Sequence, residues 1–243
     1  MWEMPPPNMN QSMDMKRLFP LLSVLLLTAA CTSEDYESGD GRWSYLRADF
    51  ADVYTNGEAY MVSAMTDEGD SLLFRQRVKP SWVTTADSCY RSLVYYNYNK
   101  VEEKADVRSV SPVLVPSVRM RNNDKDPFKD DPVKVVGGWM SSNGRYLNLD
   151  LELMTGRNDG EVVTQKLGIE CDTIATDEAG RQHVALSLYH DRNDSPEYYS
   201  SEVFVSIALR RMPVALKPGD DITLSINTYD GLWQRSFPIE YSE

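Results

Sequence analysis

Apolar and polar residues alternate with a period of two over much of the chain. The clearest runs lie in the second half, at Leu147–Leu153, Val184–Leu188, Val203–Leu209 and Ile222–Ile226. Successive side chains of a β-strand point to opposite faces of its sheet, so each run predicts a strand with one buried face and one solvated face. Antiparallel sheets that are wet on one side commonly carry this pattern.

Shorter runs of the same kind lie nearer the N-terminus. Apolar residues share one face in Leu46–Phe50 and in Leu72–Val78, and in the third segment, Tyr90–Asn99, Val94, Tyr96 and Tyr98 lie opposite Leu93 and Tyr95. Glycine and asparagine tolerate a positive φ, so Asn143-Gly144 predicts a hairpin turn just before the Leu147 strand. Short strands at turn-spaced intervals indicate sandwiches or barrels, and the chain is therefore expected to be all-β.

A polar segment with two prolines lies between the β-rich halves. Residues 121–132 read Arg-Asn-Asn-Asp-Lys-Asp-Pro-Phe-Lys-Asp-Asp-Pro. Exposed polar segments with few apolar residues are typical of linkers between domains. We therefore expect one β domain over residues 42–120, a linker over 121–132 and a second β domain over 133–243.

The first thirty residues resemble a bacterial secretory signal. Lys16 and Arg17 form a basic region, Leu18–Leu27 form a short apolar run, and small residues follow. A membrane-spanning helix needs about 20 apolar residues, so this run is too short to be one. Residues 1–30 are expected to be removed, and Met13 and Met15 are alternative translation starts that would leave residues 1–12 outside the protein.

Cys31 directly follows the small residues, as in the bacterial lipoprotein signal, whose cysteine is acylated and becomes the new N-terminus. Two or three acyl chains hold a protein on a membrane where one chain does not. Residues 31–41 then predict a lipidated tether, and the acidic start of this tether resembles the surface-export signal of Bacteroides lipoproteins. We expect an outer-membrane protein, lipid-anchored and exposed on the cell surface. Periplasmic retention, or an ordinary secretory signal with an incidental cysteine, are the alternatives.

The charge balance narrows the choice of partner. Lys and Arg total 25 against 37 Asp and Glu, which gives a formal net charge of -12. Nucleic-acid binding depends mainly on cations that neutralise phosphates, so we expect no nucleic-acid partner.

The chain offers little catalytic chemistry. Its two histidines, His183 and His190, are seven residues apart on one predicted strand, so they point to opposite faces and cannot share a metal or a proton relay. The common nucleophile, zinc and phosphate-binding motifs are absent. The aspartates of the polar segment do not fit a calcium loop, because Lys129 and Val135 stand where glycine and glutamate are needed. We expect no catalytic residue, metal or cofactor.

Aromatic residues are the better candidates for binding. Tyr96 and Tyr98 share one face of a predicted strand, where they could stack on a glycan; the alternative is that they pack the barrel with their hydroxyls at its rim. Ser71 and Thr173 lie in Asp-Ser-Leu and Asp-Thr-Ile, which resemble the short O-glycosylation acceptor pattern of Bacteroidetes. Both would have to be exposed.

Several segments of the mature chain resemble the NigD-like lipoproteins of Bacteroidetes. They are Gly39–Phe50, Trp82–Asp87 with Tyr90-Arg91, and Trp139–Leu149. The resemblance implies an N-terminal OB-like barrel followed by a C-terminal antiparallel β-sandwich. Cys89 stands where the family pattern suggests Thr or Ser, which argues against a required disulfide with Cys171.

Taken together, we expect a non-catalytic surface lipoprotein that binds or assembles with an extracellular ligand, either a glycan or a protein. Two alternatives stay open. One is a glycan-active enzyme that depends on a pair of carboxylates. The other is a bacteriocin-associated immunity or export accessory protein, which only the family name suggests.

Overall fold

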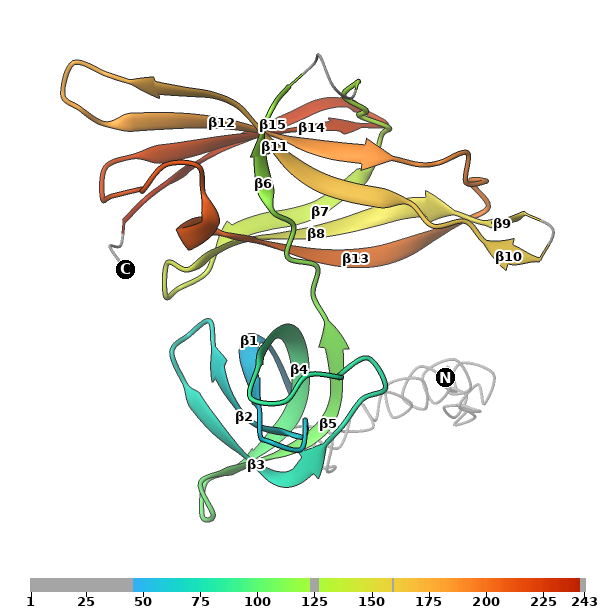
Figure 1. Ribbon diagram of the computed structural model, residues 1–243, viewed down its shortest axis with the longest axis vertical. Coiled ribbons are helices and arrows are strands. Elements are labelled where there is room, and N and C mark those ends of the chain that lie inside the picture. Colours follow the sequence, from blue (N-terminus) through green and yellow to red (C-terminus); the bar gives the residue numbers. More distant parts are fainter. Residues whose placement is uncertain (1–45, 123–126, 159, 241–243) are drawn as a thin grey trace, which may run out of the picture. The chain divides into compact units, whose positions relative to one another are not determined.

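The computed structural model describes residues 46–122, 127–158 and 160–240, which form strands and loops with one short 3₁₀ helix, η1, at Leu209–Arg211 (Figure 1). None of the described residues lies in a helix that could span a membrane. The predicted signal, Cys31 and the tether lie outside the described residues.

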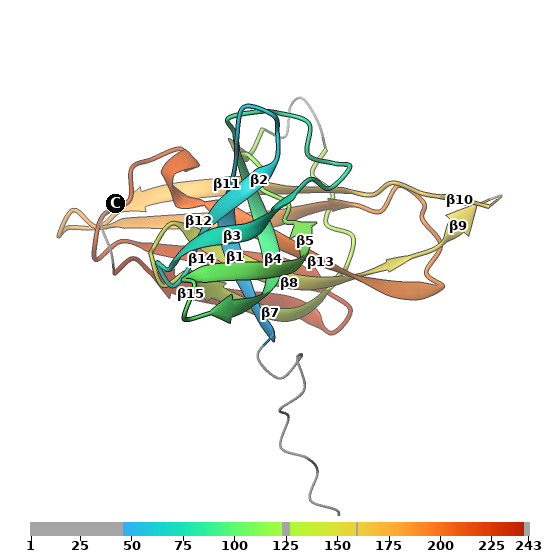
Figure 2. The ribbon, with the colours of Figure 1, turned by 90° about the horizontal axis from the view of Figure 1, so that it is seen from below.

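The first five strands close into a barrel (Figures 1 and 2). Their bounds are β1 Leu46–Thr55, β2 Met61–Thr66, β3 Ser71–Val78, β4 Cys89–Asn99 and β5 Lys104–Pro112. Their order around the barrel is β1-β2-β3-β5-β4; β1 pairs with β4 over Leu46–Tyr54 and with β2 over Ala51–Thr55. A five-stranded barrel of this kind is typical of the OB fold, and the expected OB-like domain is confirmed.

The remaining strands form the two sheets of a β-sandwich. Their bounds are β6 Val118–Met120, β7 Lys134–Met140, β8 Tyr146–Thr155, β9 Arg157–Asn158, β10 Glu161–Val162, β11 Lys166–Thr176, β12 Gln182–Asp191, β13 Tyr199–Ala208, β14 Asp221–Thr228 and β15 Gly231–Pro238. One sheet has the order β15-β14-β12-β11-β6 and the other β13-β8-β7, while β9 and β10 form a small separate hairpin. The expected sandwich is confirmed.

The larger sheet is mixed rather than purely antiparallel. Strands β12 and β14 run parallel, and so do β6 and β11. Between β12 and β14 the chain passes through β13, which belongs to the other sheet, so it returns to the first sheet in its original direction. The prediction of an antiparallel sandwich holds for the other strand pairs.

The sandwich begins earlier than the sequence suggested. β6 lies in the range predicted for the first domain, yet it pairs with β11. The amide of Arg121 donates to the Cys171 carbonyl, and the amide of His190 donates to Lys129. The described part of residues 121–132 is therefore a loop of the sandwich, because charge and proline are as common in surface loops as in linkers. The chain crosses from barrel to sandwich at residues 113–117.

The alternation predicted for the sandwich describes its core correctly. Leu147, Leu149, Leu151 and Leu153 are buried, together with the apolar faces of β12, β13 and β14. In the barrel, Leu72, Phe74, Val94 and Tyr96 are buried as their parity suggests. The first strand differs, because Ala51 and Val53 enter the barrel core and Phe50 lies on the opposite face.

Candidate functional site

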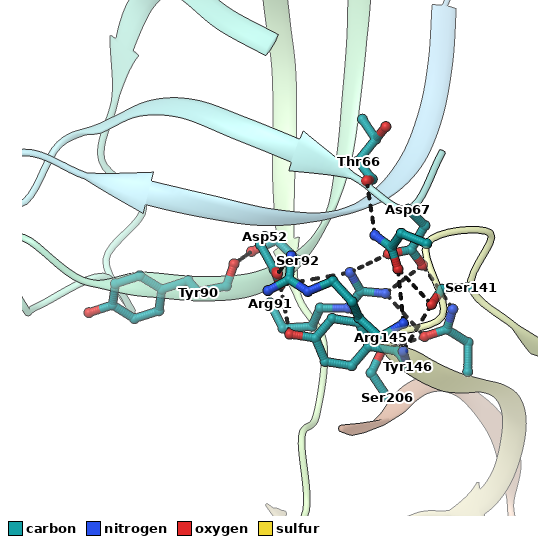
Figure 3. A network of polar contacts seen from close by, with 12 residues as sticks. Asp52, Thr66, Asp67, Tyr90, Arg91, Ser92, Ser141, Arg145, Tyr146 and Ser206 are labelled. Carbon is teal, nitrogen blue, oxygen red and sulfur yellow. Dashed lines mark hydrogen bonds and ion pairs between the residues drawn. The ribbon is translucent and has the colours of Figure 1, made fainter. Parts of the chain in front are cut away.

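A buried arginine joins the barrel to the sandwich (Figure 3). Arg91, on β4, donates from Nη1 and Nη2 to the two carboxylate oxygens of Asp67, at 2.7 and 2.6 Å. Asp67 follows β2 directly, so both residues belong to the barrel unit, and both are buried. Two parallel N–H···O bonds to one carboxylate form the strongest geometry available to an arginine.

Two residues of the sandwich complete the arrangement. The Nε atom of Arg91 donates to Ser206 Oγ at 3.1 Å, and its Nη2 donates to Asn148 Oδ1 at 3.1 Å. Asn148 in turn donates to Asp67 Oδ2 at 2.9 Å. Because Asn148 and Ser206 are fully buried on β8 and β13, these polar groups form a closed network that ties the two β units together.

A second buried carboxylate, that of Asp52, lies 3.8 Å from Arg91 Nη1. Asp52 of β1 accepts a hydrogen bond from the Tyr146 hydroxyl at 2.9 Å and forms an ion pair with Arg145 Nη1 at 2.9 Å. Burial, together with the nearby Asp52 charge, raises the pKa of Tyr146 to about 12. The tyrosine therefore stays neutral and continues to donate to Asp52 across the whole neutral range.

Aromatic rings fill the space around this network. Phe50 contacts Trp139 and Phe204 edge to face, with ring centroids 5.5 and 5.4 Å apart. The Arg91 guanidinium lies 3.9 Å from the ring centroid of Tyr146. Such contacts add to the buried apolar area of the joint. The arrangement holds two domains in one orientation, which is a positioning role rather than a chemical one.

A groove of about 610 Å³ lies beside this joint. Its walls are mostly apolar: Leu93, Tyr95, Leu114, Val203 and Phe204 line it, and Glu202 supplies a carboxylate. Asp150, whose pKa is raised by burial and by Glu202 and Glu152, does not line the groove. The groove is thus shaped for an apolar or peptide-like ligand.

The two candidate tyrosines have different surroundings. Tyr96 is fully buried in the barrel core, and its hydroxyl donates to Asp49 at 2.6 Å. Burial and this carboxylate raise the pKa of Tyr96. The prediction of an exposed stacking ring at Tyr96 is corrected, since its ring packs the barrel as the alternative held. Tyr98 is 37% exposed, and its binding role stays a prediction.

The other candidate positions are also placed. Ser71 and Thr173 are both exposed, which meets the condition for O-glycosylation without testing the modification. Cys89 is exposed, Cys171 is buried, and both are free.

The histidines hold separate hydrogen bonds. His190 is buried, with Nδ1 2.8 Å from the Asp131 carbonyl and Nε2 2.8 Å from Gln165 Oε1. His183 is part-buried, with Nδ1 2.5 Å from Asp221 Oδ2. No cluster of three or more metal-ligating side chains occurs among the residues that the structure describes.

Sequence reasoning did not identify the joint itself. The sequence presents Arg91 only within a family-like motif. Asn148 and Ser206 are polar residues on the predicted solvent face of strongly alternating strands. In the structure both are fully buried.

The geometry thus defines a class: β proteins in which an OB-like barrel is locked onto a β-sandwich by a buried polar joint. The sequence model of the NigD-like C-terminal beta sandwich domain matches residues 116–239. The chain belongs to the NigD-like family.

Solved structures share this fold. A NigD-like immunity protein from Bacteroides caccae is similar over 79% of this chain and 92% of its own, with 22% identity and a TM-score of 0.60. A protein described as a candidate toxin-related protein, from Parabacteroides distasonis, matches over 80% of this chain and 93% of its own, with 18% identity and a TM-score of 0.58. A protein described as a candidate lipoprotein, from Bacteroides fragilis, matches over 81% of this chain and 98% of its own, with 13% identity and a TM-score of 0.55. No curated protein matches the chain.

Proposed function

We propose that this chain is a non-catalytic lipoprotein, anchored in the outer membrane through acylated Cys31 and displayed on the cell surface, where it binds an extracellular protein. The observation that carries this proposal is the groove beside the joint, since it lies between two β units that the Arg91 network holds rigidly. A preformed, rigid groove binds without first ordering its walls, which saves conformational entropy. Membrane confinement adds to this by raising the local concentration of binder and partner.

The anchor can be tested separately from binding. Cys31→Ala should move the protein from the membrane fraction to the soluble fraction after cell lysis, because the acylated residue is lost. Cys89→Ala is the matched control and should remain in the membrane fraction. Mass spectrometry of the native protein should find residue 31 acylated and at the N-terminus. An unmodified Cys31 behind an intact leader would contradict the anchor.

The groove can be tested with substitutions that fill it. Leu114 is 40% exposed and Val203 is part-buried, so Leu114→Trp should narrow the groove without disturbing the Arg91 network. Loss of binding to an identified partner, with unchanged thermal unfolding, would support the groove. Unchanged binding would place the partner elsewhere. Val136→Trp, on β7, is the control for adding a tryptophan at an exposed position.

An immunity role is the second candidate, and the likeness to the Bacteroides caccae immunity protein favours it. The partner in that case would be a secreted toxin. Deleting the gene should make cells sensitive to culture supernatants of a bacteriocin-producing strain that leaves the parent unharmed. Equal survival of both strains against all supernatants tested would exclude this role.

A glycan ligand would use a different surface. Tyr98 is the exposed aromatic residue of β4 that could stack on a sugar ring. A glycan array probed with the native protein and with Tyr98→Ala distinguishes the two ligand classes. Binding that disappears with Tyr98→Ala would replace the protein partner by a glycan.

A further inference from the structure

The outer edge of β13 is largely unpaired. On one side β13 pairs with β8 over its whole length, from Tyr199 to Ala208. On the other side, within the described part of the chain, the only bridge joins Val205 to Leu114. There the Leu114 amide donates to the Phe204 carbonyl at 3.0 Å, and the Ser206 amide donates to the Leu114 carbonyl at 2.8 Å.

The register shows which other backbone groups point outward. In an antiparallel pair, the residues of one strand direct their backbone groups alternately toward the partner and away from it. Phe204 and Ser206 use their outward groups to bind Leu114, so Glu202 also directs its amide and its carbonyl away from β8. Among the described residues no backbone group pairs with either of them. The edge before Phe204 thus offers open donors and acceptors to an added strand.

The groove lies along this same stretch. Val203, Phe204 and Glu202 form one wall, and Leu114 stands at the end where the edge becomes occupied. Leu114 is bonded to the outer edge of β13 in the way that a residue of an added strand would be. Neighbouring strands lie about 4.8 Å apart, and a groove of about 610 Å³ has room for a few residues of extended chain.

The charges beside this edge are acidic. Glu202 is exposed and lies directly across from Glu152 of β8, which is paired with Lys134. In the described ranges no cation forms an ion pair with Glu202. Like charges placed directly opposite one another on paired strands are destabilising. A second copy paired about Glu202 would set a like charge across from it, whereas a basic partner would neutralise it, so the charge pattern favours a basic partner over self-pairing.

We propose that the outer edge of β13, from Ser200 to Phe204, binds an extended segment of a partner protein that alternates basic and apolar residues, as an added β-strand. This inference rests on the proposed binding function and names the chemistry of its partner. Basic side chains of the segment lie on the Glu202 face, and apolar ones lie on the opposite face beside Val203 and Leu114. Main-chain hydrogen bonds supply affinity and alternate side chains supply specificity in this mode of recognition.

The test uses the full chain with two synthetic probes, an eight-residue peptide of alternating lysine and valine and its glutamate–valine counterpart. Fluorescence anisotropy measures affinity, and hydrogen exchange measures protection of the Glu202 and Phe204 amides. We expect the lysine peptide to bind at least tenfold more tightly than the glutamate peptide and to slow exchange at both amides. Protection is the specific sign of an added strand, since a side-chain contact alone would not produce it.

Glu202→Pro removes the outward amide and, because that amide takes no part in the β8 ladder, leaves the fold intact. It should weaken binding of the lysine peptide at least tenfold. Glu202→Gln is the matched control, which keeps the amide and should lose only a few-fold through the missing charge. If Glu202→Pro unfolds, a lysine peptide N-methylated at alternate residues makes the same test from the ligand side and should not bind.

Equal binding to the native protein and to Glu202→Pro would overturn the proposal, as would N-methylation without effect. Concentration-dependent dimerisation that protects the Glu202 amide without peptide would also overturn it, in favour of a second copy. Binding that Leu114→Trp abolishes, with the Glu202 and Phe204 amides unprotected, would overturn strand addition and leave the proposed function standing.

Discussion

The barrel and the sandwich end their sheets in different ways. The five barrel strands close on themselves, whereas the two sheets of the sandwich end at β15 and β6 and at β13 and β7. The barrel is closed by the pairing of β3 with β5 at Phe74 and Ala105, so less of its backbone is left open than at the edges of the sandwich. The sandwich can bind through an edge, and the barrel then serves as a wall beside that edge. Both units are β-structure with apolar cores, so the difference between them lies in strand order alone.

The largest expected effect comes from breaking the joint between the two units. Arg91→Ala leaves the buried carboxylate of Asp67 without its cation, so the free energy of unfolding should fall by about 3–5 kcal/mol. Urea unfolding followed by tryptophan fluorescence measures this. Arg77→Ala is the control, because its ion pair with Glu58 is exposed and should matter by less than about 1 kcal/mol. Similar small losses for both variants would mean that the joint is not a stabilising element.

Equivalent core truncations in the two units test whether they unfold together. Leu149→Ala in the sandwich and Leu72→Ala in the barrel each remove a buried side chain and should each cost about 2–5 kcal/mol. If the joint couples the units, both variants lower one common unfolding midpoint. Two separate transitions in scanning calorimetry would show that barrel and sandwich unfold independently.

A smaller effect is expected at the edge of the joint. Tyr146→Phe removes the hydroxyl that donates to buried Asp52, and should cost about 1–2 kcal/mol at neutral pH. The folded pKa of Tyr146, about 12, lies above the ordinary value of 10.0. The native tyrosine therefore contributes stability that is present below pH 10 and is lost as the pH rises toward 12. Tyr146→Phe should reduce this alkaline loss, measured as urea midpoints between pH 9 and 12; an unchanged slope would contradict the assignment.

The smallest effect concerns a turn of the sandwich alone. The hydrogen bond from the Arg181 amide lowers the pKa of Asp177 to about 2, from an ordinary value of 3.8. Its contribution to stability is therefore present above pH 4 and lost as the pH falls toward 2. Asp177→Asn should flatten the acid side of the stability profile without affecting the alkaline side. The same flattening by Asp230→Asn, an exposed control on another turn, would show that the effect is not specific to Asp177.

The core residues of the sandwich could be predicted from sequence more completely than those of the barrel. In β8, β12, β13 and β14 a run of alternate residues is apolar and buried, because one face of each strand lies in a single core. In β1 the same argument predicts that the face of Phe50 is buried in the core, although the barrel core lies on the face of Ala51 and Val53. Phe50 is apolar because it packs against Trp139 and Phe204 at the joint. Alternation reports which residues are apolar, and cannot distinguish a core from an interface.

The site was beyond sequence reasoning for a related reason. Arg91 and Asn148 are 57 positions apart, and Arg91 and Ser206 are 115 apart. No local pattern marks such a network, because each member taken alone is an ordinary surface residue type. The open edge of β13 is likewise a property of strand order, and no residue pattern in β13 distinguishes it from β8, which has a partner strand on each side.

Asp67 forms hydrogen bonds within the barrel and with the sandwich, which limits how domains can be exchanged between relatives. Its carboxylate binds Arg91 within the barrel and Asn148 in the sandwich, and its carbonyl accepts the amide of Asn143 from the turn before β8. A chimera that combines this barrel with another sandwich would keep Asp67 and Arg91. The new sandwich would need an amide at the position of Asn148 and a hydroxyl at the position of Ser206 to form hydrogen bonds with them. These four positions, together with Asp52 and its partners Arg145 and Tyr146, therefore give a first test of compatibility between halves before any hybrid gene is made.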